Sequence, residues 1–125
     1  MNWTAVGSVA LAVAVMSGAF GAHALRGRLD AYSIGIYERA VFYHFVHALG
    51  LLIVAALPRG GIITPAAASW VCVLLLAGIV IFCGSLYALA TTGVRLLGAI
   101  TPIGGLAFIA AWLLLAWSAI ARPGA

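Results

Sequence analysis

Residues 66–90 read AAASWVCVLLLAGIVIFCGSLYALA, a run of 25 residues without a charged side chain. An α-helix rises about 1.5 Å per residue, so this run is long enough to cross the roughly 30 Å hydrocarbon core of a bilayer. Such a segment fits a soluble domain only if the remainder of the chain supplies polar surface. The composition of that remainder therefore decides the class of protein.

The chain has 125 residues, of which 66% are hydrophobic and only 6% are charged. Soluble domains contain roughly 45–50% apolar and about 25% charged residues. A chain of this composition cannot cover its own surface with polar groups. Soluble globular, disordered, coiled-coil and disulfide-scaffold proteins are therefore excluded, and an integral membrane protein remains.

Four apolar stretches are long enough to span a membrane, and they cover residues of about 3–25, 40–57, 66–90 and 96–121. A closed β-barrel is the other structure that spans a bilayer, but the alternating pattern of its strands is absent and four short strands cannot close a barrel. We therefore expect an all-α fold, an integral membrane four-helix bundle, with residues 1–125 in a single domain.

The first stretch ends in the sequence AHA at 22–24, which resembles the cleavage site of a signal peptide. Two observations oppose cleavage: Met1 and Asn2 supply no basic region, and the apolar run is longer than in a usual signal peptide. We interpret this stretch as the first membrane helix.

The connection 26–39 is the one long link between predicted helices. Its apolar and aromatic residues fit one face of a short helix lying in the membrane interface. These residues are Leu29, Tyr32, Ile36 and Tyr37. An ordinary loop explains the segment equally well, so both interpretations stay open.

The arginines predict an orientation. Four crossings put both termini on one side, together with Arg59 and Arg122. The opposite side carries Arg26, Arg28, Arg39 and Arg95. Because positive charge is retained in the cytoplasm, we expect both termini outside and the long connection inside.

The formal net charge of +4 comes from six arginines against two acidic residues. The arginines lie singly between apolar segments and form no patch, so a nucleic-acid partner is not expected. Cys72 and Cys83 are eleven residues apart on one predicted helix, about 16 Å, which exceeds the roughly 7 Å reach of a disulfide. We expect both to act as small buried apolar residues.

Small residues recur at every fourth position of the first helix, at Ala10, Ala14, Gly18 and Ala22. Stripes of this kind let helix backbones approach closely in lipid. The stripe predicts close helix packing, with a partner inside the chain, in a second copy or in a larger membrane complex.

Polar side chains gather in one half of the predicted bilayer, where such groups are costly and therefore informative. The candidate site consists of His23, Arg39, Tyr43, His44, His47, Ser85, Tyr87, Arg95 and Thr101. A hydrogen-bond network between helices, binding of a ligand or lipid headgroup, and a metal or haem site are the three interpretations. No carboxylate or thiolate obviously completes a metal shell, so we expect no metal and no cofactor.

The depth of the histidines follows from the expected start of the second helix. If that helix begins near residue 40, His44 and His47 lie roughly 6 and 10 Å below its start. Three residues apart, they share a face that Arg39 and Tyr43 adjoin.

Sequence motifs for catalysis are missing. The chain has no G-x-S-x-G elbow, no phosphate-binding or dinucleotide-binding glycine motif and no H-E-x-x-H, so we expect no enzyme. Small exporters of this size use a carboxylate within the membrane, and no predicted span contains one. Proton-linked transport would then depend on the histidines.

Four motifs in order carry a resemblance to a known family: GAFGAHAL at 18–25, AVFYHFVHAL at 40–49, GSLY at 84–87 and TPIGGL at 101–106. With Trp112, they resemble the YgdD-like family of small bacterial inner-membrane proteins, whose function is unknown. The resemblance covers nearly the whole chain and implies a four-helix inner-membrane protein, but it implies no activity. Relatives often have a glycine where this chain has Ala111.

Three hypotheses follow. The first is a structural or accessory membrane component without catalysis. The second is a protein that binds a lipid, a quinone or another small ligand at the polar cluster. The third is a proton-linked transporter that uses the histidines.

Overall fold

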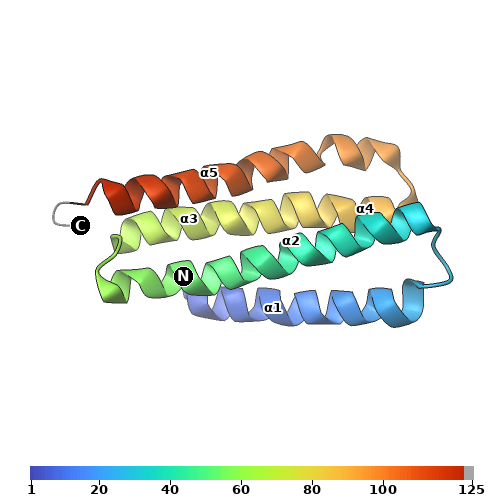
Figure 1. Ribbon diagram of the computed structural model, residues 1–125, viewed down its shortest axis with the longest axis horizontal. Coiled ribbons are helices and arrows are strands. Elements are labelled where there is room, and N and C mark those ends of the chain that lie inside the picture. Colours follow the sequence, from blue (N-terminus) through green and yellow to red (C-terminus); the bar gives the residue numbers. More distant parts are fainter. Residues whose placement is uncertain (123–125) are drawn as a thin grey trace.

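The protein forms four long helices that lie side by side in a computed structural model describing residues 1–122 (Figure 1). The elements are α1 (Trp3–Phe20), the π-helical turn η1 (Gly21–Leu25), α2 (Ala31–Ala56), the 3-10 turn η2 (Leu57–Gly60), α3 (Pro65–Gly78), the π-helical turn η3 (Ile79–Cys83), α4 (Gly84–Thr92), the 3-10 turn η4 (Arg95–Ala99) and α5 (Thr101–Ile120). α3, η3 and α4 follow one another without a break and act as one long helix.

Each of the four long helices has the length and apolarity of a candidate membrane span. With their adjoining turns they are Trp3–Leu25, Ala31–Gly60, Pro65–Thr92 and Arg95–Ile120, of 23, 30, 28 and 26 residues. A bilayer core requires about 20 apolar residues, so each is long enough. The expectation of an all-α bundle of four apolar helices is confirmed.

Side-chain caps fix the start of three helices. Asn2, Asp30 and Thr64 each accept a hydrogen bond from the backbone N–H three residues ahead, at the starts of α1, α2 and α3. Such caps satisfy backbone donors that the first helical turn leaves free. η2 and α4 each end at a glycine with left-handed backbone, Gly61 and Gly93, a conformation that glycine adopts readily because it has no Cβ atom.

The second helix begins at Ala31, which corrects the expected start near residue 40. Of the segment 26–39, which was expected to be a loop or a separate interfacial helix, residues 31–39 form the first part of α2. Asp30 caps it, and Ile36 and Tyr37 are buried on its inner face. Glu38 is exposed on the other face, so its charge does not interrupt the helix.

In Figure 1 the four long helices follow one another in the order α1, α2, α3 with α4, and α5, and side chains also join α2 to α5 and α1 to α3. α2 packs on α1 along one side and on α3, η3 and α4 along the other, and α5 packs on α3 and η3 (Figure 1). The two central helices bury 39% of the residues in their most apolar window, whereas α1 and α5 bury only 17%. The outer helices therefore present most of their surface to their surroundings.

The core lies between α2 and the helix formed by α3, η3 and α4. Its largest fully buried residues include Leu51, Val54, Val71, Leu75, Cys72 and Cys83. Both cysteines carry free thiols, in agreement with the expectation from their spacing.

Two glycines let α5 approach its neighbour closely. A Cβ atom at Gly104 would overlap the backbone of Phe82 in η3, and one at Gly78 would overlap the ring of Phe108. A side chain at either position would push α5 away. The π-helical turn and the glycines therefore meet where α5 packs against η3.

The stripe of small residues on α1 lies partly in the interface with α2. Ala10 and Ala14 are buried, Gly18 is half-buried beside Val41, and Ala22 is exposed. Ala10 and Ala14 of the stripe therefore lie in the interface with α2 of the same chain, whereas Ala22 lies outside it.

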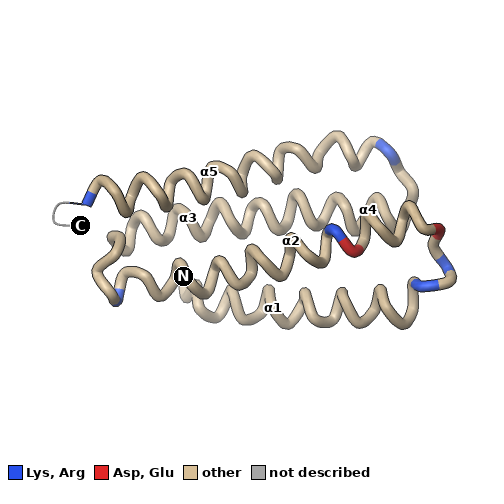
Figure 2. The backbone as a smooth tube through the Cα atoms, viewed as in Figure 1, with Lys and Arg blue, Asp and Glu red and all other residues tan. Residues whose placement is uncertain are grey.

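Charged residues lie almost entirely at the two ends of the bundle (Figure 2). One end carries Arg59 and Arg122, and the guanidinium of Arg122 donates a hydrogen bond to the Gly61 carbonyl. The other end carries Arg26, Arg28, Asp30 and Arg95, whereas Glu38 and Arg39 lie part of the way along α2. The middle of the bundle is free of charge, as a membrane span requires.

Candidate functional site

The structure separates the predicted polar cluster into three groups and an exposed remainder. Six of the nine candidate residues lie between helices: Tyr43, His44, His47, Ser85, Tyr87 and Thr101. His23, Arg39 and Arg95 are exposed, and no hydrogen bond links them to the others. The single cluster that sequence analysis expected is therefore not formed.

The first group joins α1, α2 and α4 through aromatic residues and a histidine. The Nδ1 atom of His44 lies 3.0 Å from the hydroxyl oxygen of Tyr87. The ring of Tyr87 in turn packs on the ring of Tyr37, with centroids 5.1 Å apart. The Tyr37 hydroxyl donates a 2.6 Å hydrogen bond to the Ser17 carbonyl of α1.

The direction of the His44–Tyr87 hydrogen bond depends on the tautomer of the histidine ring: the Tyr87 hydroxyl donates to a bare Nδ1, or an Nδ1–H donates to the hydroxyl oxygen. The backbone of Ala10 in α1 also approaches the His44 ring. His44 therefore contacts polar groups of both α4 and α1.

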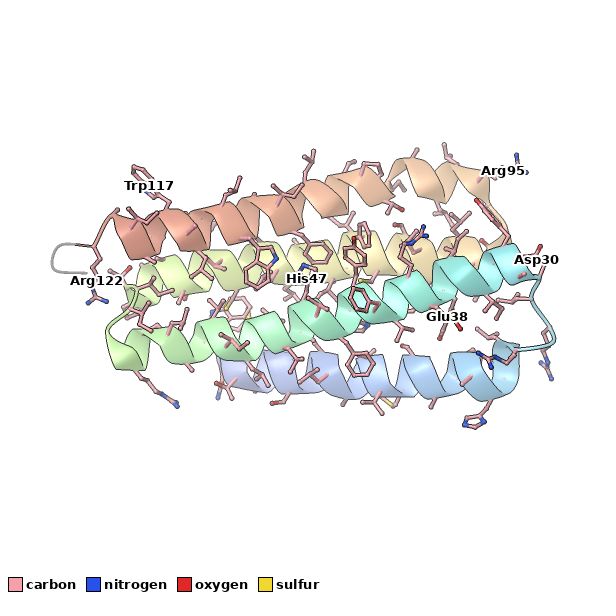
Figure 3. All side chains as sticks on the ribbon, in the orientation of Figure 1. Asp30, Glu38, His47, Arg95, Trp117 and Arg122 are labelled. Carbon is pink, nitrogen blue, oxygen red and sulfur yellow. The ribbon has the colours of Figure 1, made fainter. Side chains whose placement is uncertain are left out.

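The second group encloses His47 among aromatic rings. Its Nδ1–H donates to the Tyr43 carbonyl at 2.7 Å, within α2. Its ring stacks on Phe108 of α5 with a centroid separation of 3.5 Å and an interplanar angle of 15°. Tyr43 and Trp112 lie on the same ring at 5.8 Å. His47 is thus packed as an aromatic residue in the middle of the bundle (Figure 3).

The third group fastens α4 to α5. The hydroxyl oxygens of Ser85 and Thr101 are 2.6 Å apart. The Ser85 hydroxyl also lies 3.0 Å from the Phe82 carbonyl, and the Thr101 hydroxyl 3.4 Å from the Leu97 carbonyl. Two protons serve these three contacts, and the shorter distances favour Thr101 donating to Ser85 and Ser85 donating to Phe82.

The two histidines face different neighbours, although three residues separate them on one helix. His44 meets α4 and α1, whereas His47 meets α5. Among residues 1–122, no three histidine, cysteine, aspartate or glutamate side chains converge in a way that could hold a metal ion. The expectation of a site without metal stays a prediction.

The distance of the two histidines from the start of their helix differs from the expected value, because α2 begins at Ala31. His44 and His47 lie 13 and 16 residues into α2, about 20 and 24 Å from Ala31 along the helix. The 26-residue helix places His44 at its midpoint. The expected depths of roughly 6 and 10 Å are too small because the helix begins earlier.

Some residues of these groups were missing from the predicted site. Tyr37 was assigned to the long connection, and Ser17, Phe82 and Phe108 carried no signal of their own. The glycines beside the aromatic residues were the available clue, because a Cβ at Gly21 would overlap the Tyr37 ring.

Glu38, also missed, forms an exposed ion pair with Arg26 at 3.4 Å, a contact worth about 0–1 kcal/mol.

Two open cavities adjoin the bundle. A groove of about 450 Å³ lies over α2 between α1 and α3, with His44 as its polar lining residue. A cleft of about 640 Å³ at the charged end is lined in part by Asp30, Tyr32 and Arg95. Ser33, whose backbone N–H and side chain both hydrogen-bond to the Asp30 carboxylate, lines the same cleft. The buried polar groups, in contrast, hydrogen-bond to one another between the helices.

Comparison with known proteins places the sequence among bacterial membrane proteins. Residues 17–105 match the family described as "Protein of unknown function (DUF423)". The UPF0382 membrane protein YwdK of Bacillus subtilis is 44% identical over 117 residues, covering 92% of this chain and 93% of the relative. The UPF0382 membrane protein SH2409 of Staphylococcus haemolyticus is 47% identical over 110 residues, 88% of each chain. No solved structure matches. The resemblance inferred from the four motifs is confirmed.

Proposed function

This chain belongs to the DUF423 family of unknown function, and from that premise we propose that it is a structural or accessory component of the bacterial inner membrane without catalytic activity. The proposal depends on one observation: polar side chains inside the bundle hydrogen-bond to other helices of the same chain. Tyr37, Ser85 and Tyr87 each pair with a group on another helix. Hydrogen bonds of this kind hold helices together in lipid, where they are worth roughly 0.6 kcal/mol each.

The outer helices supply the surfaces for association. α5 exposes a row of large apolar residues, Ile103, Leu106, Ile109, Leu113 and Ile120. α1 likewise exposes Met16 and Phe20. The partner under this proposal is a second copy of the chain or a larger membrane complex, and lipid covers whatever surface the partner leaves free.

The test combines crosslinking in the native membrane with a mass measurement. A photoreactive amino acid at Ile109 or Leu113 should give adducts of protein mass, whereas the same probe at the buried Ala111 should not. Native mass spectrometry after gentle extraction should give more than one chain. A lone monomer with only lipid adducts would overturn the proposal.

Two alternatives remain open to experiment. A binding role is favoured by the groove beside His44. A histidine-dependent transporter is favoured by the row of His44, Tyr87 and Tyr37, which joins that groove to the region near the Arg26–Glu38 pair. Transport predicts a proton flux in liposomes that His44→Phe abolishes, and absence of any response to a pH gradient removes this alternative.

Orientation belongs to the same proposal. Arg26, Arg28 and Arg95 lie at one end and Arg39 lies in the half of α2 nearer to it, whereas the opposite end carries Arg59 and Arg122, so we propose that both termini lie outside and the Arg26–Asp30 connection in the cytoplasm. A cysteine introduced at Asn2 should react with a membrane-impermeant thiol reagent in intact cells, and one introduced at Arg28 should not. The reverse pattern would invert the assignment.

A further inference from the structure

The cleft at the charged end of the bundle joins three segments of the chain. It has a volume of about 640 Å³, and its walls include Asp30, Tyr32, Ser33, Leu89, Gly93 and Arg95. These residues belong to the start of α2, the end of α4 and the start of η4. Small-molecule sites typically measure about 300–1,000 Å³ and contain a few polar groups that orient the ligand. This cleft has that size, and its walls carry charges of both signs.

The charged residues of α2 place the cleft at the level of the lipid headgroups. Glu38 and Arg39 are both exposed, and the next charge along the chain is Arg59 in η2. Between them runs an uncharged segment of about 20 residues, the length that crosses the hydrocarbon layer. The first turns of α2 therefore lie outside that layer, together with Asp30. Figure 3 shows Asp30 and Arg95 at this same end of the bundle, on separate elements.

The negative side of the cleft is the Asp30 carboxylate, which Ser33 holds in place. The Ser33 backbone N–H donates to it at 2.7 Å, and the Ser33 side chain also hydrogen-bonds to it. These contacts lower the pKa of the carboxyl below its usual 3.8, so the group is charged at neutral pH. An ionised carboxylate has about four acceptor positions, and Ser33 uses two of them. The remaining positions can accept hydrogen bonds from a ligand.

The end of α4 adds to the negative side. The helix ends at Gly93, which lies in the wall of the cleft. The last carbonyl groups of a helix have no donor within the helix and carry partial negative charge. A cation in the cleft is therefore favoured by this helix end as well as by Asp30.

The positive side of the cleft is the guanidinium of Arg95. Among residues 1–122 the ion pair joins Arg26 to Glu38, so Arg95 and Asp30 line one cleft without pairing with each other. Arg95 is exposed, and within the same residues it donates no side-chain hydrogen bond. Its long side chain is thus free to turn towards a ligand. A guanidinium binds phosphate oxygens through two parallel N–H bonds.

The chemistry of the walls selects among lipid headgroups. A headgroup with only negative charge is repelled by Asp30 and by the end of α4. A quaternary ammonium group donates no hydrogen bond and is bound by cages of aromatic rings, whereas Tyr32 is the one aromatic residue in the lining. A primary ammonium group donates three hydrogen bonds and suits a carboxylate. Phosphate and primary ammonium together describe a phosphoethanolamine group.

We propose that the cleft binds the headgroup of phosphatidylethanolamine, with its phosphate at Arg95 and its ammonium group at Asp30. Leu89 lies one helical turn before Gly93, nearer to the middle of the bundle, so the acyl chains leave the cleft along its apolar side. The binding involves no covalent step. It does not depend on the proposed structural role, because one chain contains the whole site.

The experiment measures lipid binding to the purified full chain by native mass spectrometry. Dioleoyl phosphatidylethanolamine, phosphatidylcholine and phosphatidylglycerol are titrated separately into the same detergent. The three lipids have the same acyl chains, so differences in affinity come from the headgroup. We expect phosphatidylethanolamine to bind about fivefold more tightly than either of the others, the upper value for an ion pair between exposed groups.

Two variants separate the roles of the two charges. Arg95→Gln removes the partner of the phosphate, so the affinity for phosphatidylethanolamine and for phosphatidylcholine should fall about fivefold. Asp30→Asn keeps an acceptor for the helix cap and removes the charge. The preference for phosphatidylethanolamine over phosphatidylcholine should then disappear, while the affinity for phosphatidylcholine stays the same. Loss of folded protein would instead lower the binding of all the lipids together.

Arg28→Gln and Glu38→Gln are the matched controls. Both residues are exposed, and neither lines the cleft. Each control removes the same charge as one of the two variants, so it separates a local effect from a change in net charge. Affinity and preference should stay within about twofold of the unmodified chain.

Three results would overturn the proposal. The first is equal binding of the three lipids by the unmodified chain. The second is a preference that persists in Asp30→Asn, or equal affinities in Arg95→Gln and Arg28→Gln. The third is competition by glycerophosphoethanolamine at a concentration comparable to that of the lipid, which would assign the cleft to a water-soluble ligand of the same chemistry. A monomer that shows the expected preference would support this proposal and overturn the structural role, so the two can fail separately.

Discussion

The hydroxyl oxygens of Ser85 and Thr101 lie 2.6 Å apart and join the start of α4 to the start of α5. A few residues along α5, Gly104 rests against the backbone of Phe82. α5 is thus held on η3 by a polar pair and a close backbone approach at neighbouring levels. Both contacts can be tested separately.

The hydroxyl pair should contribute a modest, specific free energy. In a double-mutant cycle with Ser85→Ala and Thr101→Val, we expect a coupling energy of about 0.6 kcal/mol, the average for hydrogen bonds between membrane helices. The free energy of unfolding in detergent provides the measurement. Thr91→Val is the control, because the Thr91 hydroxyl bonds only to the backbone of its own helix. A coupling energy of zero would contradict the pairing.

The close approach at Gly104 should tolerate no side chain. Gly104→Ala places a Cβ against the Phe82 backbone, which cannot rotate away, so we expect a loss of about 3 kcal/mol in the free energy of unfolding, the upper end for overpacking. Gly105→Ala is the matched control, since its Cβ would meet the Phe82 ring at an ordinary 3.7 Å. Equal stability of the two variants would mean that α5 packs differently.

The Tyr37 hydroxyl should stabilise the contact between α1 and α2. Tyr37→Phe keeps the ring and removes the hydrogen bond to the Ser17 carbonyl. That carbonyl retains a partner in the Gly21 N–H, so the expected loss is only about 0.5–1 kcal/mol. Thermal unfolding checks the value, with Tyr32→Phe as control because Tyr32 is 75% exposed. A larger effect of Tyr32→Phe would be inconsistent with this assignment.

The start of α2 should loosen in acid. The backbone N–H of Ser33 donates to Asp30 and lowers the pKa of that carboxyl below its usual 3.8. A lowered folded-state pKa means that the stabilisation is fully present above the unfolded pKa and is lost as the pH falls through the folded pKa. The protection of the Ser33 amide, measured as its hydrogen-exchange rate relative to that of the unfolded chain at the same pH, should therefore fall below about pH 4.

Asparagine at position 30 separates the cap from its charge. Asp30→Asn keeps an oxygen acceptor but does not titrate, so the acid dependence of Ser33 exchange should disappear while the helix still begins at Ala31. Asp30→Ala should accelerate the exchange at every pH. An unchanged acid dependence in Asp30→Asn would show that another group causes it.

The four helices and their apolar faces could be predicted because runs of uncharged residues are a local property of the chain. The start of α2 could not be predicted in this way. Glu38 and Arg39 were interpreted as the end of a polar connection, whereas both lie on one exposed face of a helix whose other face buries Ile36 and Tyr37. The neighbouring helices α1 and α4, both of which contact Tyr37, make that inner face necessary.

Six of the nine candidate polar residues do lie between helices, but which of them contact one another could not be predicted. His44 and His47 were placed on a shared face, and the roughly 60° between them around the helix is enough to turn one towards α4 and the other towards α5. Which helix lies beside which is a tertiary property. His23 illustrates the same point. Its position along the first helix could be predicted, but the sequence does not show that its side chain is exposed rather than directed at another helix.

The order of the helices has a consequence for how the chain is assembled. α2 packs on α1, the helix of α3 and α4 packs on α2, and α5 packs on α3 and, through Phe108, on His47 of α2, so each helix packs on helices that precede it in the chain. Every helix that enters the bilayer finds its neighbour already there, and no later helix must be inserted between two earlier ones. Pairing of successive segments keeps loop closures short, which favours rapid folding. The helices can therefore insert into the bilayer and pack one after another as the chain leaves the ribosome.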